Sequence, residues 1–255
     1  MPATPAWPPR SAPRLFVDQV LADSAQICIG GNQAHYLSRV MRVTPGDAVI
    51  LCDNVTGEWA ARVVDAGKRD VMLETVERLR PREEVPDFWL CAALLKKDRF
   101  DLVLEKATEL GVAKIQPVIT RRCVADKLNI DRARHIVTEA AEQCARTALP
   151  EVAEPVRLEE LLKHWPNDRT LYFADEQGGD RAAAAFAAHA NPAALVTGPE
   201  GGFEHAERMA IAQLPQARSI TLGPRILRGE TAAIVGTALW MGTMGDWSET
   251  TDRKE

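Results

Sequence analysis

The apolar pattern of the chain changes at the segment 80–86 (RPREEVP), and this change determines which folds are open to it. Before this segment, short alternating runs bounded by turn residues predict strands at 15–17, 25–29, 48–52, 58–65 and 71–76. Several short strands with a single short helical pattern, at 35–42, are typical of a small β-barrel. The two prolines and four charged residues of the segment itself predict a linker.

After the linker, strand patterns alternate with helical patterns. We expect strands at 88–95, 115–119, 171–174, 194–197 and 220–222, and helices at 98–110, 131–146, 181–189, 206–213 and 230–241. This alternation predicts an α/β fold with a mostly parallel sheet. Folds of this class bind ligands in the loops beyond the carboxyl ends of their strands.

These patterns predict five parts: a flexible proline-rich start (1–13), a β-barrel (14–80), a linker (81–86), an α/β domain (87–246) and a polar tail (247–255). The start contains five prolines and no apolar core. We therefore expect neither a signal peptide nor a transit helix, and a cytoplasmic location. The longest apolar run, 231–244, is shorter than the roughly 20 residues that span a bilayer, so we expect no membrane contact.

Composition excludes several classes of site. The five cysteines are scattered without a C-x-x-C pair, and the five histidines form no H-x-x-x-H pair, so we expect neither a disulfide framework nor a metal site. A net charge of −5 argues against strong nonspecific binding of nucleic acid by the whole chain. Residues 96–146, however, carry 11 basic against 8 acidic residues, which is weak evidence for an RNA-binding face.

Two glycine-bearing loops follow predicted strands. In the first, Gly198-Pro199-Glu200-Gly201-Gly202-Phe203, the glycines allow main-chain groups to approach a ligand closely, although a tight turn alone would need one or two of them. In the second, residues 222–232 (LGPRILRGETA), Ile226 and Leu227 are placed to flank a flat apolar ligand such as adenine, unless they fill the core beside a solvated charge pair. The sequence contains neither G-x-G-x-x-G nor G-K-[ST]. This absence excludes an ordinary dinucleotide-binding fold and a phosphate-binding P-loop.

A third feature is the helical segment 135–146, in which Glu139, Glu142, Gln143 and Arg146 fall at i, i+3, i+4 and i+7. This spacing places the four polar side chains on one face of a helix. Taken alone, this spacing is better explained by a solvated amphipathic helix.

Together, the two loops and Glu142-Gln143-Cys144-Ala145-Arg146 resemble the small-subunit ribosomal RNA uridine-N3 methyltransferases of the SPOUT superfamily, the ribosomal RNA small subunit methyltransferase E family. Arg14-Leu15-Phe16, residues 97–101 (KDRFD) and residues 105–112 (EKATELGV) extend the likeness to about residues 14–245. It implies a PUA-like barrel for RNA binding, a SPOUT α/β domain with a trefoil knot, and a homodimer with its active site near the dimer interface.

The resemblance also implies S-adenosylmethionine (SAM) as methyl donor, without a metal, and methylation of N3 of a uridine in 16S ribosomal RNA during ribosome biogenesis. The implied SAM site consists of main chain and side chains from both loops: Thr197, Gly198, Glu200, Gly201, Gly202, Leu222, Gly223, Ile226, Leu227, Arg228 and Thr231.

Because uracil N3 carries a proton at neutral pH, the reaction needs a base or a cation that favours the anion. We expect Arg228 to stabilise the negative charge on the uracil carbonyls, with Glu200 or Glu230 as weaker candidates for the base. The expected RNA-binding residues are Arg14, Arg42, Lys97, Arg121, Arg122, Gln143 and Arg146.

The expected partner is 16S ribosomal RNA in an assembled small subunit. Two alternatives remain at this point. One is a noncatalytic RNA-binding or ribosome-assembly protein that retains the fold but does not bind SAM. The other is a SPOUT methyltransferase that acts on another RNA base.

Overall fold

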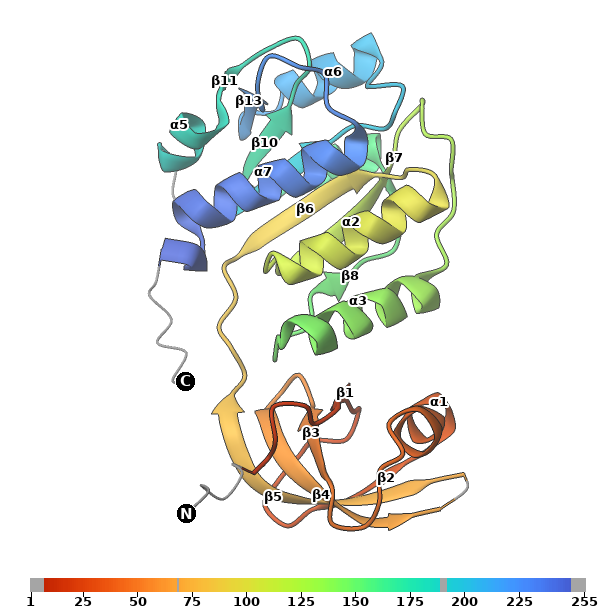
Figure 1. The fold of residues 1–255 in the computed structure, drawn as a ribbon. Coiled ribbons are helices and arrows are strands. Elements are labelled where there is room, and N and C mark those ends of the chain that lie inside the picture. Colours follow the sequence, from red (N-terminus) through yellow and green to blue (C-terminus); the bar gives the residue numbers. More distant parts are fainter. Residues whose placement is uncertain (1–6, 68, 189–191, 249–255) are drawn as a thin grey trace. The chain divides into compact units, whose positions relative to one another are not determined.

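A computed structural model describes residues 7–67, 69–188 and 192–248 of the chain. The chain forms two compact units (Figure 1). Met1–Glu84 and Ala141–Leu149 belong to the first unit, and Val85–Ala140 and Pro150–Glu255 belong to the second. The segment Ala141–Leu149 thus interrupts the region for which the sequence predicts one continuous α/β domain. Part of the proline-rich start and of the polar tail, residues 1–6 and 249–255, lies outside the described residues.

The first unit is built mainly of strands. Its elements are β1 (Arg14–Phe16), β2 (Gln26–Ile29), α1 (Gly31–His35), a π-helical turn (Tyr36–Val40), β3 (Ala48–Cys52), β4 (Gly57–Ala66) and β5 (Val71–Pro81). They form one five-stranded sheet in the order β1-β3-β4-β5-β2, in which β1 and β3 are parallel and the other pairs antiparallel. The last residue of β5, Pro81, is also the first residue of the predicted linker.

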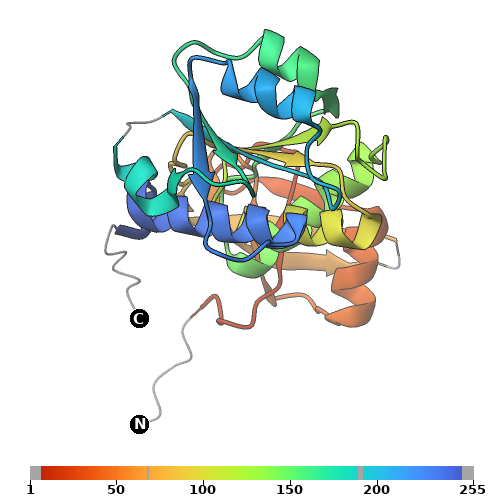
Figure 2. The ribbon, with the colours of Figure 1, turned by 90° about the horizontal axis from the view of Figure 1, so that it is seen from above.

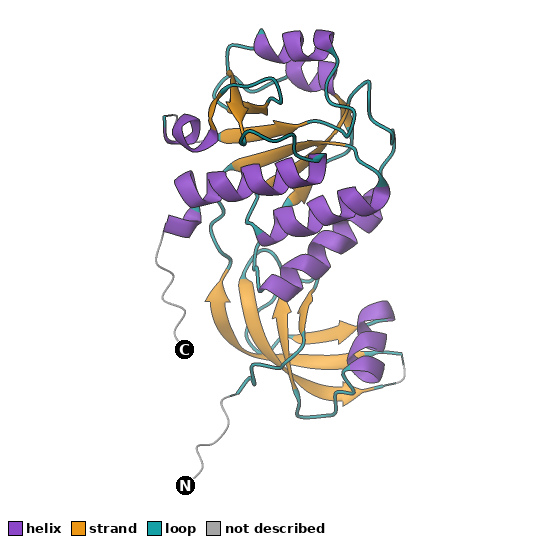
Figure 3. Ribbon diagram, turned by 45° about the horizontal axis from the view of Figure 1, so that its top comes forward, coloured by secondary structure: helices purple, strands orange, loops and turns teal. Residues whose placement is uncertain are grey.

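The long strands β4 and β5 curve along their length (Figure 3). Their pairing contains three register shifts, between Glu58 and Trp59, Ala60 and Ala61, and Val63 and Asp65. Irregularities of this kind increase the twist and bend of a strand, as small barrels require. The curved sheet buries an apolar core to which β2 contributes alternate residues, Ile27 and Ile29. Closure of the sheet into a barrel stays a prediction.

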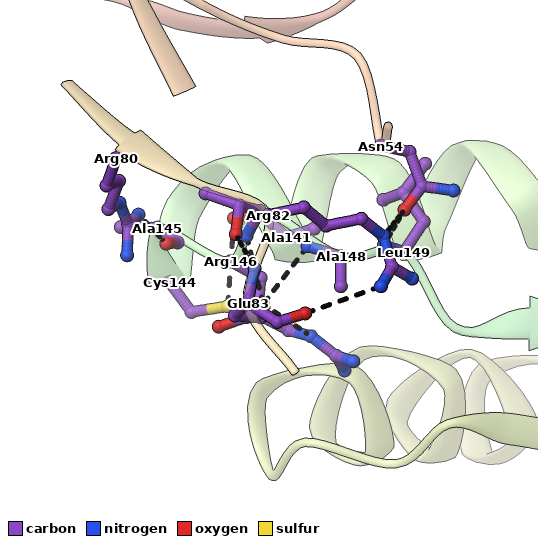
Figure 4. Close-up of polar contacts among 11 residues, drawn as sticks. Asn54, Arg80, Arg82, Glu83, Ala141, Cys144, Ala145, Arg146, Ala148 and Leu149 are labelled. Carbon is purple, nitrogen blue, oxygen red and sulfur yellow. Dashed lines mark hydrogen bonds and ion pairs between the residues drawn. The ribbon is translucent and has the colours of Figure 1, made fainter. Parts of the chain in front are cut away.

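Glu83 anchors the segment Ala141–Leu149 within the first unit (Figure 4). Its Oε1 accepts hydrogen bonds from the backbone N–H groups of Thr147 and Ala148, at 2.9 and 3.1 Å, and lies 3.4 Å from Nε of Arg146. Asn54 Oδ1 accepts a further hydrogen bond from the Leu149 N–H at 2.8 Å. One carboxylate therefore satisfies several polar groups of a chain segment about 60 residues away in sequence.

The second unit is an α/β domain, as predicted. Its elements are β6 (Phe88–Ala93), α2 (Lys97–Glu109), β7 (Lys114–Ile119), α3 (Ile130–Cys144, whose last four residues belong to the first unit), β8 (Glu151–Val152), β9 (Val156–Arg157), α4 (Leu158–Lys163), β10 (Thr170–Ala174), β11 (Asp180–Arg181), α5 (Ala182–Ala187), β12 (Ala193–Thr197), α6 (His205–Ala212), β13 (Ala217–Thr221), α7 (Gly229–Met244) and a 3₁₀ turn (Asp246–Ser248). The described strands pair in parallel, in the order β11-β13-β10-β12-β6-β7-β8, and β9 also pairs with β7.

Helices cover both faces of this sheet: α4 and α6 lie on one side, and α2, α5 and α7 on the other (Figure 2). Each strand serves both faces because successive side chains point in opposite directions. In β10, Phe173 joins the core beneath α4 and α6, whereas Tyr172 packs edge-on against Phe186 of α5. In β6, Phe88 stacks on Trp240 of α7 with ring centroids 4.2 Å apart.

The connection from β13 to α7 has to cross the sheet. In the strand order, β10 separates β13 from β12, yet α7 packs against β12 and β6. The chain therefore crosses the carboxyl end of β10 over residues 222–228 before α7 begins. The trefoil knot that the family resemblance implies stays a prediction, and this crossing is the segment that it concerns. In the described part of the chain, no helix is both long and apolar enough to span a bilayer.

Asp53 provides a test of how the first unit is held together. Burial would raise the pKa of its carboxyl, but hydrogen bonds from the N–H groups of Leu21, Val55 and Thr56 and from the Thr56 hydroxyl lower it below 3.8 overall. The ionised form therefore stabilises the fold above pH 3.8, and this contribution is lost as the pH falls through the lower pKa of the folded state.

We predict that Asp53→Asn lowers the free energy of unfolding by about 2 kcal/mol at pH 7, the scale of hydrogen bonds to a charged group. The difference from the unmodified chain should shrink as the pH falls below 3.8. Urea unfolding followed by circular dichroism across this pH range measures it. Asp23→Asn, at an exposed site, is the control. A difference that is constant with pH would contradict this assignment of the carboxylate.

Candidate functional site

A pocket of about 130 Å³ lies in the second unit where three strand-to-helix connections meet. Its walls are the loops that follow β10, β12 and β13, together with the start of α7. All three strands are parallel neighbours, so their carboxyl ends face the same edge of the sheet. Loops at this edge are the usual ligand site of α/β folds, as the sequence pattern predicts.

The structure brings both predicted loops into this pocket. Six of the expected cofactor-site residues line it: Gly198, Gly202, Leu222, Gly223, Ile226 and Leu227. Thr197, Glu200, Gly201, Arg228 and Thr231 lie next to lining residues in the chain but are not part of the wall. Thr197 is the buried last residue of β12, and Gly201 lies against Arg122.

Two glycines of the first loop are required by its geometry. A Cβ at Gly198 would lie 2.9 Å from the ring of Phe203, and Gly202 adopts a φ of +68°, where side chains are disfavoured. The main chain can therefore turn sharply beside the cavity. The opposing loop contributes apolar side chains: Ile226 is 84% exposed and Leu227 is half-buried, so both can contact a ligand.

The third wall was missed by sequence reasoning. It consists of Ala174, the last residue of β10, and of Asp175 and Glu176, which follow it; Arg208 from α6 completes this wall. Nη2 of Arg208 lies 2.6 and 2.7 Å from the two carboxylate oxygens of Asp175, and both side chains are nearly buried. The only sequence signal for this wall was a pair of acidic residues directly after a strand. Acidic residues at such positions are also commonly solvated and have no role in a site.

The three predicted catalytic residues have different surroundings. Glu230 is buried and its Oε1 lies 3.1 Å from Nη1 of Arg99 on α2. Glu200 is exposed and accepts a long, 3.4 Å hydrogen bond from the N–H of Lys96. Arg228 is the exposed N-cap residue of α7, and among the described residues its guanidinium has no hydrogen-bonding or ion-pair partner. Their catalytic roles stay predictions.

Three of the predicted RNA-binding residues belong to the second unit. Lys97 is exposed at the start of α2. Arg122 donates a hydrogen bond to the carbonyl of Gly201 at 3.0 Å, so it supports the glycine loop from outside. Arg121 forms ion pairs with Glu159 and Glu204 at 3.3 and 3.4 Å, and side-chain hydrogen bonds to these carboxylates raise the pKa of its guanidinium.

The other four belong to the first unit. Arg42 and Gln143 are exposed. Arg14 forms an ion pair with Glu58, and Arg146 is buried beside Glu83. The sequence placed Arg146 on a helix face with Gln143, but α3 ends at Cys144 and Ala145 takes a φ of +62°. The helical spacing therefore does not apply to Arg146, and its buried guanidinium is not on a surface for RNA.

The pocket offers main-chain polar groups, an apolar patch and a few charges, which suits a small ligand with a flat apolar part. Burial raises the pKa of Cys52 and Cys91 to about 12, so neither thiol is a nucleophile at neutral pH. Within the described ranges, no group of three or more His, Cys, Asp or Glu side chains is arranged to hold a metal ion.

Each of the two units contains a region that matches a known protein family. The model of an RNA methyltransferase domain matches residues 82–241, and the model of an RNA methyltransferase PUA domain matches residues 29–75. The chain is 31% identical to the ribosomal RNA small subunit methyltransferase E of Rickettsia conorii, over 88% of this chain and 93% of the relative. It is 32% identical to the protein of the same name from Synechocystis, over 88% of this chain and 76% of the relative.

Two solved structures have the same fold over nearly the whole chain. Ribosomal RNA small subunit methyltransferase E from Neisseria gonorrhoeae, bound to SAM, superposes with a TM-score of 0.84 at 27% identity, covering 92% of this chain and 99% of that one. A putative methyltransferase from Legionella pneumophila in complex with SAM gives a TM-score of 0.81 at 26% identity, covering 91% and 97%.

We predict that Arg208→Ala destabilises the second unit by about 3–5 kcal/mol, because it leaves the Asp175 carboxylate buried without its cation. The double variant Arg208→Ala/Asp175→Asn should regain part of this loss by removing the unpaired charge. Urea unfolding measures both variants, with Arg134→Ala, on the exposed face of α3, as the control. Equal losses in the single and double variants would contradict the pairing.

Proposed function

This chain belongs to the ribosomal RNA small subunit methyltransferase E family, and we propose that it methylates N3 of a uridine in 16S ribosomal RNA with SAM as donor. One observation carries the proposal: the two family loops and the start of α7 converge on one pocket at the carboxyl edge of the parallel sheet. The relatives and solved structures named above, two of which are structures with SAM bound, support the choice of reaction and donor.

The pocket fits an adenosyl ligand. Ile226 and Leu227 provide an apolar surface for a flat base, and the turns at Gly198 and Gly202 leave the main chain open to polar contacts. SAM supplies a methyl group that is already activated on a sulfonium. The chain therefore has to bind and align the reactants, and to remove the proton from the accepting nitrogen.

We assign to Arg228 the stabilisation of the negative charge that develops on the uracil. Once N3 loses its proton, negative charge spreads onto the neighbouring carbonyl oxygens, and a guanidinium stabilises it. Arg228 is exposed and stands at the N-terminus of α7, where the helix dipole also favours an anion. The N3 electron pair then forms the bond to the methyl carbon, and the pair of the broken C–S bond stays on sulfur.

Two carboxylates near the pocket, those of Glu200 and Glu230, are candidates for the proton acceptor. Glu230 is buried, and its carboxylate already forms an ion pair with Arg99. Glu200 is exposed and contacts only the Lys96 N–H among the described residues. We propose Glu200 or Glu230 as the base, with transfer to bulk water as the alternative that a variant series would identify.

RNA binding is proposed for exposed basic residues of both units. Arg42 and Lys97 have no ion-pair partner among the described residues, and Arg121 and Arg122 lie on the loop behind the glycine turn. The preferred substrate is an assembled small subunit, in which protein and RNA already hold the target region open. We also propose a cytoplasmic homodimer, for which the exposed Leu239 and Trp247, in and after α7, are candidate contacts.

Mass spectrometry of nucleosides tests the reaction directly. The purified protein, SAM and undermethylated small subunits should yield N3-methyluridine in 16S ribosomal RNA, with less product on free RNA. Methylation at another base would identify a SPOUT enzyme of different specificity. A protein that binds RNA but neither binds SAM by calorimetry nor methylates would instead be an assembly factor. Light scattering of the same sample gives the oligomeric state.

We predict that Arg228→Ala lowers kcat by about 10²–10³-fold, the cost of removing one donor that stabilises an anionic transition state. The affinity for SAM should change by less than about threefold, because Arg228 is outside the pocket wall. Single-turnover methylation and calorimetry measure the two effects, with Arg134→Ala as the control. Normal turnover would remove Arg228 from the mechanism, and a matched loss of SAM affinity would assign it to donor binding.

A further inference from the structure

The loop after β10 contains a charged residue that neither family loop accounts for. We propose that the carboxylate of Glu176 makes the pocket prefer the cationic donor SAM over S-adenosylhomocysteine (SAH), the neutral thioether that remains after transfer. The inference rests on the proposed use of SAM. It assigns to one side chain of the third wall a role in distinguishing substrate from product.

The backbone around Glu176 is held in place on both sides. The N–H of Asp175 donates to the carbonyl of Ile220 on β13 at 3.0 Å, and the N–H of Gly178 donates to the carbonyl of Asp175 at 3.2 Å. The N–H of Gln177 donates to the carboxylate of Asp175 at 2.7 Å. Glu176 is thus the second residue of the four-residue turn from Asp175 to Gly178, and three hydrogen bonds of its neighbours hold the backbone of this turn.

The side chain of Glu176 reaches across to the glycine loop. Its Oε1 lies 3.1 Å from the point where a Cβ on Gly202 would stand, so the carboxylate lies against the turn that shapes the opposite wall. Both residues line the cavity. A ligand held between these loops is therefore within a few ångströms of a negative charge.

The charge of Glu176 is not neutralised by its neighbours. Four charged residues line the pocket, Asp175, Glu176, Arg208 and Arg225. Arg208 is paired with both oxygens of Asp175 and also lies over the ring of Phe173, so this pair contributes no net charge. Among the described residues, Glu176 makes no hydrogen bond or ion pair. It is the unpaired negative charge of the lining, and Arg225 is the unpaired positive one.

This arrangement distinguishes donor from product by charge. SAM and SAH share the adenosine and the amino acid, so contacts to these parts act equally on both. They differ by the methyl group and by the positive charge on sulfur. Glu176 is exposed to solvent but lines the pocket, and its carboxylate attracts that charge by an energy that depends on distance and screening. We expect about tenfold, or roughly 1.4 kcal/mol, in the ratio of the two dissociation constants.

The test is the ratio of the dissociation constants for SAH and SAM, measured by calorimetry without RNA. In Glu176→Gln this ratio should fall about tenfold, mainly because SAM binds more weakly. Asp180→Asn removes a negative charge from an exposed site on β11, the strand that follows this loop, outside the pocket wall, and should leave the ratio within about twofold. Glu176→Asp keeps the charge on a shorter side chain and should restore most of the ratio.

Two outcomes would overturn the inference, and a third would contradict the proposed function on which it rests. An unchanged ratio in Glu176→Gln, with normal SAM binding, removes the charge effect and leaves the proposed function intact. Equal weakening of SAM and SAH would assign Glu176 to a group that both share. Failure of the unmodified protein to bind SAM would instead contradict the proposed function itself. Circular dichroism and thermal melting of each variant separate these results from misfolding.

Discussion

The site depends on how closely α7 approaches the strand beneath it. A Cβ at Gly236 would lie 2.4 Å from Cδ2 of Leu195 on β12, and one at Gly229 would lie 2.8 Å from the carbonyl oxygen of Gly198. Neither position accommodates a larger residue without a shift of main chain or core. Because α7 is held over β12 and its chain arrives from β13, residues 222–228 have to lie across the end of β10. The pocket wall is a consequence of that packing.

Much of the fold could be predicted from local patterns. Apolar runs such as 194–197 and amphipathic spacing such as 98–110 report directly on which side chains are buried, so β12 and α2 appear within a few residues of their predicted positions. The two-residue strands β8, β9 and β11 and the single-turn-scale helix α4 are too short to show a period. The three strands exist only because they pair with β7 and β13, and only the tertiary structure defines this pairing.

The sequence predicted the parts of the pocket wall that are formed by main-chain turns, but it did not predict the parts that are formed by charged side chains. Gly198, Gly202 and Gly223 stand out in sequence because a turn needs them, and all three line the pocket. No sequence pattern distinguishes Asp175, Glu176 and Arg208 from ordinary surface residues. Only the tertiary structure brings these charged residues together in the pocket wall. Arg146 shows the reverse error. Its spacing indicated an exposed helix face, but the left-handed Ala145 ends the helix and directs the chain to Glu83.

These differences separate two kinds of recognition in one pocket. In the proposed binding of SAM, the glycine turns and the apolar pair Ile226 and Leu227 would recognise the shape of the ligand through main chain and contact area. The net charges of the pocket wall are those of Glu176 and Arg225. Neither side chain forms a hydrogen bond or an ion pair with a described residue. A change at Glu176 can therefore alter affinity without disturbing the turns, whereas a change at Asp175 or Arg208 affects stability first. Substitutions at two neighbouring residues of one loop should therefore have different effects: a change at Glu176 would alter the proposed preference for SAM, and a change at Asp175 would alter stability.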